Sequence, residues 1–328
     1  MNPRRLTFHT AAALVAVACA YSVANRSTSE RPEMDPPPVF EVKDSELLEL
    51  RFARGLTTLT LEPRLDDQKE RYAWVTVAPE GKRPVSFRGG RYASHVLDGY
   101  LPLRAIRSLG KLSPAQLEEG GLKSANETVT LRTASGERKL VLGSATVAGE
   151  GRRALAPDSG RSFILANDLL PAPERAAQEM FDPALHAFSN DEITQVAIES
   201  LGSRREAVSQ GKLDPPRFWS WREDLEHPSQ ELTSWADHVE RMAGRAPIVV
   251  DNPGEPVLTL TYFHAERQLG YLKLWPCLHE ERWIRCVGVT EHTVGFVEMG
   301  PVAEQIVNDA QRMLGVAARG EQATRTMK

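Results

Sequence analysis

The chain has 328 residues, enough for one large domain or two of ordinary size. Hydrophobic residues make up 41% and charged residues 26%, which excludes a collagen-like chain and a wholly disordered one. The net charge is −4, whereas a nucleic-acid-binding protein relies on a basic surface, so no nucleic-acid partner is expected.

The N-terminal residues predict export. Arg4 and Arg5 precede a stretch without formal charge, Leu6 to Asn25. A helix of about 20 residues spans a bilayer core, and basic residues before it favour a cytoplasmic N-terminus. Residues 1–25 are therefore predicted to be a signal anchor, but their short, alanine-rich centre is also typical of a cleavable signal peptide. Lipidation at Cys19 and a cytoplasmic location remain open as well.

A proline-rich linker is predicted over residues 26–39. It contains three consecutive prolines, which favour an extended polyproline conformation and cannot continue a helix. The folded part is expected to begin at about residue 40, and residues 317–328 are predicted to be a disordered tail. These features predict a single-pass protein of the bacterial inner membrane, with the bulk of the chain in the periplasm.

The folded part begins with a predicted hairpin. Between residues 46 and 61, apolar and polar residues alternate on both sides of Gly55, which is the pattern of two strands joined by a turn. The alternation predicts that Leu48, Leu50 and Phe52 share one face of the first strand.

The same order of elements occurs twice. After the first hairpin come a third strand, YAWV (72–75), and a helical spacing of apolar residues over 94–110. In the second half, a hairpin around Gly202 is followed by RFWSW (217–221) and a helical stretch at 234–244. Each half then has another hairpin, a strand, a proline and a helix. The fold class predicted is α+β, with two tandem, similar modules of largely antiparallel sheet and helices on one face.

The expected modules are residues 40–182 and 183–316. The chain resembles the uncharacterised DUF4340 family in the order and spacing of five segments: YAWV (72–75), LSPAQLEEGGL (112–122), ERKLVLG (137–143), SFILANDLL (162–170) and FDPALHAFSNDEITQVAI (181–198). The resemblance covers about residues 40–200. It implies a membrane-anchored extracytoplasmic protein of a kind that is sometimes encoded beside ABC-type transporters of the gliding-motility type, and it supplies no catalytic residues.

Two cysteines are candidates for a disulfide. Cys277 and Cys286 bracket eight residues that could fold as two short arms, which would place the sulfur atoms opposite each other. Two free thiols, or a metal site that includes His264, His279 or His292, remain open. The spacing matches no zinc-site signature.

The sequence contains no local catalytic signature. It has no nucleophile elbow, P-loop or dinucleotide-binding glycine motif. The segment DNPGEP (251–256) lacks the ligand spacing of a calcium loop and predicts a turn. We therefore assign no catalytic residue, cofactor or metal ligand. Trp283, beside the predicted hairpin tip, is the candidate interaction surface.

The leading functional hypothesis is a non-enzymatic, membrane-anchored extracytoplasmic protein that binds integral-membrane subunits of a transport or gliding-motility-like complex. A second hypothesis is a periplasmic solute- or glycan-binding protein that uses the cleft between the modules. A third is an exported hydrolase whose site is assembled from residues far apart in the sequence.

Overall fold

The computed structural model describes residues 38–43, 46–66, 69–147, 149–211, 217–280, 283–293 and 295–316, with the backbone alone for the described part of 278–285. The predicted anchor (1–25), most of the predicted linker (26–39) and the predicted tail (317–328) lie outside these residues. Among the described helices, none has the length and apolar character needed to cross a bilayer.

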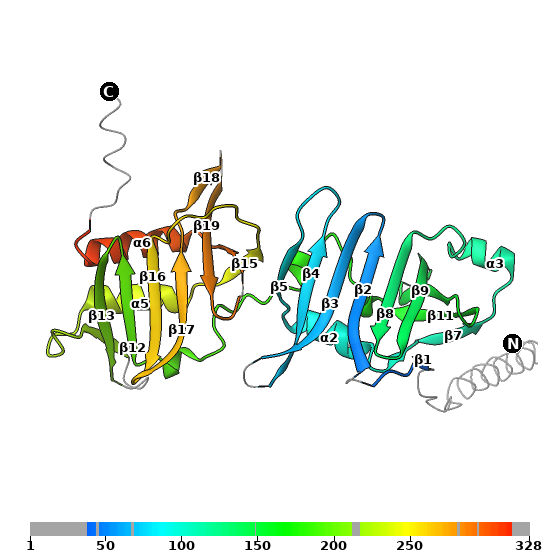
Figure 1. Ribbon diagram of the computed structural model, residues 1–328, viewed down its shortest axis with the longest axis horizontal. Helices are drawn as coiled ribbons and strands as arrows, with labels where there is room; N and C mark the ends of the chain where they lie inside the picture. Colours follow the sequence, from blue (N-terminus) through cyan, green and yellow to red (C-terminus); the bar gives the residue numbers. More distant parts are fainter. Residues whose placement is uncertain are drawn as a thin grey trace, which may run out of the picture. The chain divides into compact units, whose positions relative to one another are not determined.

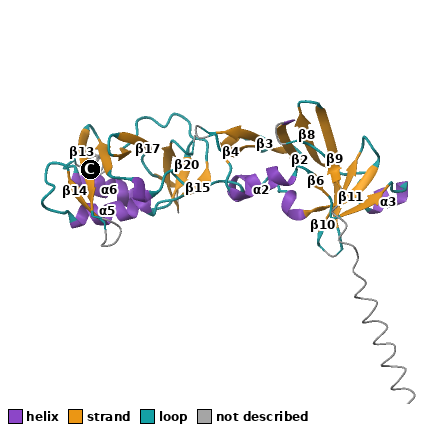
Figure 2. Ribbon diagram, turned by 90° about the horizontal axis from the view of Figure 1, so that it is seen from below, coloured by secondary structure: helices purple, strands orange, loops and turns teal. Residues whose placement is uncertain are grey.

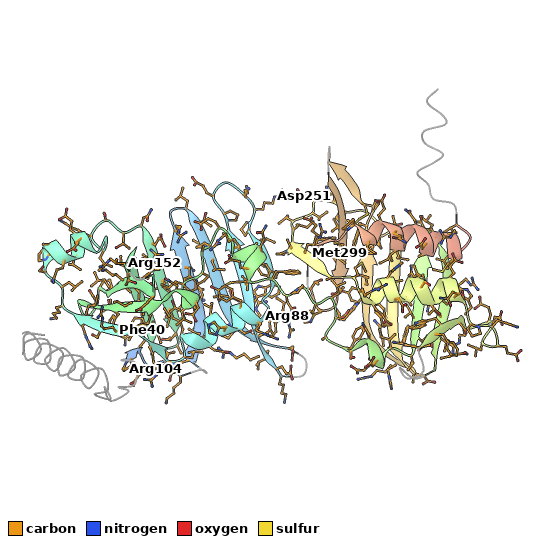
Figure 3. All side chains as sticks on the ribbon, turned by 180° about the vertical axis from the view of Figure 1, so that it is seen from behind. Phe40, Arg88, Arg104, Arg152, Asp251 and Met299 are labelled. Atoms are coloured by element: carbon orange, nitrogen blue, oxygen red, sulfur yellow. A yellow bond between two sulfur atoms is a disulfide. The ribbon has the colours of Figure 1, made fainter. Side chains whose placement is uncertain are left out.

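The described chain is an α+β structure built mostly of antiparallel sheet (Figure 1). A small sheet pairs β1 (Pro38–Phe40) with β6 (Leu103–Arg104), and Figure 3 labels Phe40 and Arg104 on these strands. Two nine-stranded sheets contain the other strands. The structure thus combines antiparallel sheets with a few short helices, and the predicted α+β class is confirmed.

The first large sheet takes all its strands from the first half of the chain. Its order is β5-β4-β3-β2-β8-β9-β10-β11-β7. The strands are β2 (Leu47–Arg54), β3 (Thr57–Leu65), β4 (Arg71–Ala78), β5 (Val85–Arg88), β7 (Arg107–Gly110), β8 (Glu127–Thr133), β9 (Gly136–Ala145), β10 (Gly151–Ala156) and β11 (Arg161–Ala166).

The second large sheet takes all its strands from the second half. Its order is β14-β13-β12-β16-β17-β19-β20-β15, and β18 pairs with β19 outside this path. The strands are β12 (Gln195–Ser200), β13 (Ser203–Gln210), β14 (Phe218–Trp221), β15 (Gly244–Pro247), β16 (Leu258–His264), β17 (Arg267–Leu274), β18 (Leu278–Glu280), β19 (Trp283–Thr290) and β20 (Val297–Met299).

The two strand orders correspond. In the first sheet β4, β3 and β2 come before β8, and in the second β14, β13 and β12 come before β16. The edge strands β7 and β15 also correspond, whereas β5 has no counterpart among the described strands. The buried side chains of both halves belong to one connected cluster, so the boundary between modules at residues 182 and 183 stays a prediction.

The first hairpin forms as predicted, but one residue faces the other way. Leu50 and Phe52 are fully buried, whereas Leu48 is 47% exposed and Glu49 is buried. The register between β2 and β8 shifts between Leu47 and Glu49. Because a bulge changes which side chains face the core, strict alternation fails at this point, and the prediction for Leu48 was wrong.

The two tryptophan strands correspond in position but differ in what they bury. Trp219 on β14 is 3% exposed, and the Arg217 guanidinium lies 4.6 Å from its ring centroid. On β4 the buried residues are Ala73, Val75 and Val77, so the alternating Trp74 points to the opposite face of the sheet. Trp74 is only half-buried there.

The helices are α2 (Arg91–Gly99), α3 (Pro114–Glu119), α4 (Ala176–Glu179), α5 (Gln230–Glu240) and α6 (Val302–Met313), and η2 (Asn167–Leu169) and η3 (Asn190–Glu192) are 3₁₀ turns. The predicted helical stretch 94–110 is wrong beyond Gly99. Proline cannot continue a helix, and after Pro102 the chain enters β6 and then β7, which pairs with β11.

Figure 2 shows α5 and α6 next to each other, and the Trp235 indole N–H on α5 donates to the Ile306 carbonyl on α6 at 3.0 Å.

Two glycine segments that carried the family resemblance lie in contact. Ser113 caps α3, and the chain then passes through Gly120 to Leu122. A Cβ atom on Gly143 of β9 would lie 2.3 Å from the Gly120 carbonyl oxygen, so no side chain fits there. The backbone N–H and the hydroxyl of Ser144 both donate to that same oxygen.

Candidate functional site

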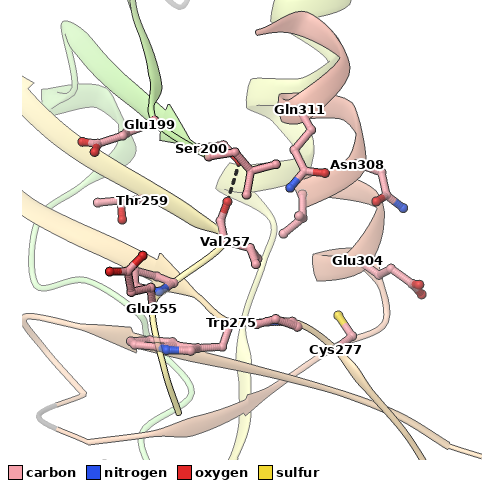
Figure 4. A pocket seen from close by; sticks show the side chains of 15 residues that line it. Glu199, Ser200, Glu255, Val257, Thr259, Trp275, Cys277, Glu304, Asn308 and Gln311 are labelled. Atoms are coloured by element: carbon pink, nitrogen blue, oxygen red, sulfur yellow. Dashed lines mark hydrogen bonds between the residues drawn. The ribbon is translucent and has the colours of Figure 1, made fainter. Parts of the chain in front are cut away.

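A cavity of about 880 Å³ opens at one end of the second large sheet (Figure 4). It is lined by the end of β12, the start of β16, the residues that follow β17, and one side of α6. Its volume lies within the range of roughly 300–1,000 Å³ that is typical of ligand sites. We name it the Gln311 pocket, after the most buried polar residue of α6 in its lining, and define its polar wall by Glu255, Trp275, Asn308 and Gln311.

Helix α6 supplies one wall because of its residue spacing. Glu304, Asn308 and Gln311 recur at intervals of four and three residues and therefore lie on one side of the helix, toward the pocket. Ala303 and Ala310 are fully buried and anchor the helix on the sheet.

Gln311 is the most unusual residue of this wall. It is only 7% exposed, and its side chain lines the pocket, where Figure 4 shows the amide on the inner side of α6. No residue in the described part of the chain hydrogen-bonds to this amide. An amide offers two N–H donors and a carbonyl acceptor, and in Gln311 these groups face the pocket. A ligand in the pocket could hydrogen-bond to this amide.

Trp275 forms a fixed aromatic wall. Its indole N–H donates to the Gly254 carbonyl at 3.1 Å, and its ring makes an edge contact with Phe296, with ring centroids 4.9 Å apart. Both contacts hold the ring in one orientation. The neighbouring Ser200 hydroxyl donates to the Val257 carbonyl at 2.5 Å, so this hydroxyl is already used by the fold.

The lining is acidic. It includes the carboxylates of Glu199, Glu255 and Glu304 and, among the described residues, no lysine, arginine or histidine. Two arginines near α6 are engaged elsewhere: Arg205 with Glu223, and Arg312 with Glu231 at 2.9 Å.

The two predicted cysteines meet beside this pocket. Cys277 and Cys286 form a disulfide in the structure, and Cys277 lines the pocket. Strands β18 and β19 are the two arms that the sequence suggested, with Leu278 opposite Arg285. Trp283 begins β19, but its side chain lies outside the described part, so an interaction surface there stays a prediction.

A second group of ionisable residues surrounds a smaller cavity of about 420 Å³. His186 contacts Glu291 at 2.9 Å, and its ring stacks on Phe188. His292, which is not part of that cavity's lining, contacts Asp182 at 3.1 Å. Burial by itself raises the pKa of Asp182, but hydrogen bonds from His292 and from a backbone N–H outweigh it, and the net pKa lies below the ordinary value. Each histidine thus has a carboxylate partner, and no Ser, Thr or Cys among the described residues hydrogen-bonds to either imidazole ring.

Arg217 and Glu240 form a partly buried pair near this second cavity. Their side chains approach to 3.2 Å, and Arg217 also donates to the Asn190 carbonyl. Burial raises the pKa of Glu240, and the nearby Arg217 only partly opposes the shift. These contacts attach the start of β14 to α5, so we interpret this group as structural. In the described residues, no cluster of three or more His, Cys, Asp or Glu side chains has the arrangement of a metal site.

No family model matches this chain, and no curated protein or solved structure is significantly similar to it. The resemblance to the DUF4340 family therefore stays a prediction.

Sequence reasoning missed the Gln311 pocket. The segment that contains Glu255 was interpreted as a turn, and only the fold shows that Glu255 and α6 line the same cavity. One signal was present in the sequence: Gln311 interrupts the apolar stripe formed by Ile306, Val307, Ala310 and Leu314. A polar residue within an apolar stripe indicates that something other than the apolar core lies beside it, and here that is the pocket.

Proposed function

We propose that this chain is a non-enzymatic extracytoplasmic protein, held at the bacterial inner membrane by residues 1–25, that acts by binding other proteins. Its partners are integral-membrane subunits of an ABC-type transport or gliding-motility-like complex. The N-terminal sequence pattern and the proline-rich linker support the location. The disulfide between Cys277 and Cys286 is consistent with an oxidising compartment.

The proposal includes two tandem modules of one design, residues 40–182 and 183–316. The matching strand orders of the two large sheets support this interpretation. The Gln311 pocket belongs to the second half, so we assign the binding role to the second module.

The observation that carries the binding function is the Gln311 amide. It is buried, it lines a cavity of ligand size, and the described chain leaves it without a hydrogen-bond partner. A binding partner that reaches this pocket would hydrogen-bond to the amide.

Site-specific photo-crosslinking in membranes tests this function. A photoreactive amino acid in place of Asn308, which lies on the pocket rim, should crosslink the full-length chain to integral-membrane proteins. The same group at Glu266, at the opposite end of the β16–β17 hairpin, is the matched control. Adding Gln311→Leu should remove the Asn308 crosslink. Equal crosslinking from both positions, or none from Asn308, would refute the proposal.

A solute- or glycan-binding protein is the second candidate. An aromatic ring beside amides and carboxylates is how many proteins bind sugars, and Trp275, Asn308 and Glu255 provide these groups. This cavity lies within the second half and not between the halves. A rise in melting temperature with one sugar or peptidoglycan fragment, lost on Trp275→Ala, would favour it, and a uniform lack of response across the panel would argue against it.

A further inference from the structure

We infer that the smaller cavity, of about 420 Å³, binds the backbone amide of an apolar residue in a segment of a partner protein. We name this cavity the Tyr262 pocket. Side chains from the segment 182–193, from the end of α5 and from Tyr262 on β16 line it. The inference adds a second contact of stated chemistry to the proposed protein-binding function and rests on that function.

His186 is held so that one ring nitrogen is left for a ligand. Its Nδ1 contacts the Glu291 carboxylate at 2.9 Å, and since a carboxylate only accepts, Nδ1 carries the hydrogen. Glu291 is itself fixed: it accepts from the Tyr271 backbone N–H at 2.8 Å, and a Cβ atom on Gly270 would lie 2.3 Å from its carboxyl carbon. Nε2 of the neutral His186 ring is therefore an acceptor, and no described residue hydrogen-bonds to it.

Tyr262 supplies a donor close to this acceptor. The residue is 3% exposed, and its ring makes an edge contact with the His186 ring, with centroids 4.7 Å apart. Burial raises the pKa of the Tyr262 hydroxyl, and the carboxylates of Glu291 and Glu240 raise it further, so the phenol stays protonated and donates. A secondary amide has one acceptor and one donor, so it fits this pair of side chains.

The charged groups of the lining are already engaged in the fold. The Asp182 carboxylate accepts from His292 and from the backbone N–H of Ala184. Glu240 pairs with Arg217 at 3.2 Å. The lining contains no lysine or arginine for an anionic ligand, and a cationic ligand would have to compete with these existing partners. The pocket therefore favours a neutral ligand.

The rest of the lining selects an apolar side chain next to the amide. Leu185, Phe188, Ile193, Val239 and Met242 border the cavity. An aliphatic side chain gains free energy by leaving water for such a surface. We therefore expect leucine, isoleucine, valine or methionine at this position of the partner segment.

Ligand-observed NMR titrations of the full-length chain in detergent measure this binding, with empty micelles as the blank. The probes are N-acetylleucine methylamide, its glycine counterpart, and the leucine probe with both amide nitrogens methylated. The leucine probe should bind with a dissociation constant of roughly 1 mM, as expected for a ligand of its size. The glycine probe should bind about tenfold or more weakly because it lacks the apolar side chain. The methylated probe should bind about threefold or more weakly because it has no N–H for His186.

Two variants locate the site. Tyr262→Phe keeps the ring and removes only the hydroxyl, so it should weaken binding of the leucine probe about three- to tenfold. Tyr271→Phe removes the same group from the neighbouring strand β17, outside the lining of the pocket, and should leave binding unchanged. Melting temperatures check that both variants fold. An end-capped pentapeptide of alanines with a central leucine should bind more tightly than the single-residue probe.

The outcomes separate this inference from the proposed function. Equal binding of the leucine and glycine probes, or equal effects of Tyr262→Phe and Tyr271→Phe, would overturn the inference. If no probe binds while the Asn308 crosslink still depends on Gln311, protein binding stands and the inference falls. If the pentapeptide binds more weakly than the single-residue probe, the pocket takes a small free amide and the protein source is wrong. Loss of both the probe binding and the crosslink would remove both proposals.

Discussion

The disulfide makes a quantitative prediction about stability. It closes a loop with a sequence separation of 9 between Cys277 and Cys286. In the chain-entropy treatment, closing such a loop removes about 8.7 cal/mol/K from the unfolded ensemble, which is about 2.6 kcal/mol at about 25 °C. The double variant Cys277→Ala/Cys286→Ala should therefore lower the free energy of unfolding by about that amount. The packing lost around Cys286, which is 1% exposed, would add to the effect.

Urea unfolding followed by tryptophan fluorescence measures this difference. The oxidised wild type, the reduced wild type and the double variant are compared, and the double variant is the control for the reductant, because it should not respond to it. Alkylation of the denatured, unreduced chain should leave Cys277 and Cys286 unlabelled. Labelling of both, or a stability change under about 0.5 kcal/mol, would refute the pairing or its energetic role.

Three further predictions concern particular contacts. Gly143→Ala should cost about 1–3 kcal/mol by forcing β9 away from the Gly120 carbonyl, whereas Gly300→Ala, whose nearest neighbour would be 3.8 Å away, should be near neutral in thermal unfolding. Trp235→Phe should cost about 1 kcal/mol in urea unfolding, because the Ile306 carbonyl loses its side-chain donor and keeps only its bond within α6; an unchanged stability would contradict that hydrogen bond. Burial alone would raise the pKa of Glu127, but hydrogen bonds from Arg152 and Arg54 outweigh it and lower the net pKa below the ordinary 4.5. Its stabilising contribution is therefore present at neutral pH and lost as the pH falls below about 4.5, so Glu127→Gln should flatten the stability profile in that acidic range.

Local features were largely predictable from the sequence. The hairpins around Gly55 and Gly202 form where their residues indicate. These elements depend on contacts between residues close in the chain, so a short window contains the information. The strand at 107–110 was missed because its partner, β11, lies more than fifty residues away in the sequence.

The side chains that each element buries were harder to predict. Alternation placed Leu50 and Phe52 correctly but failed at Leu48, because a bulge needs one extra residue and leaves no clear mark on the apolar pattern. Trp74 and Trp219 occupy corresponding strands, yet only Trp219 is fully buried.

The sequence by itself determined most of the order of the strands and helices and the turn positions, because each follows from backbone preference or short separation along the chain. It offered the pairing of Cys277 and Cys286 as one of several alternatives, and the structure decided between them. Only the tertiary structure decided that Ser200, Glu255 and Gln311 line one cavity. These residues come from separate elements, and they meet because the sheet brings the ends of β12 and β16 together and the apolar stripe of α6 packs across them. The position of Gln311 in this cavity depends on all of these contacts together, so no single stretch of the sequence encodes it.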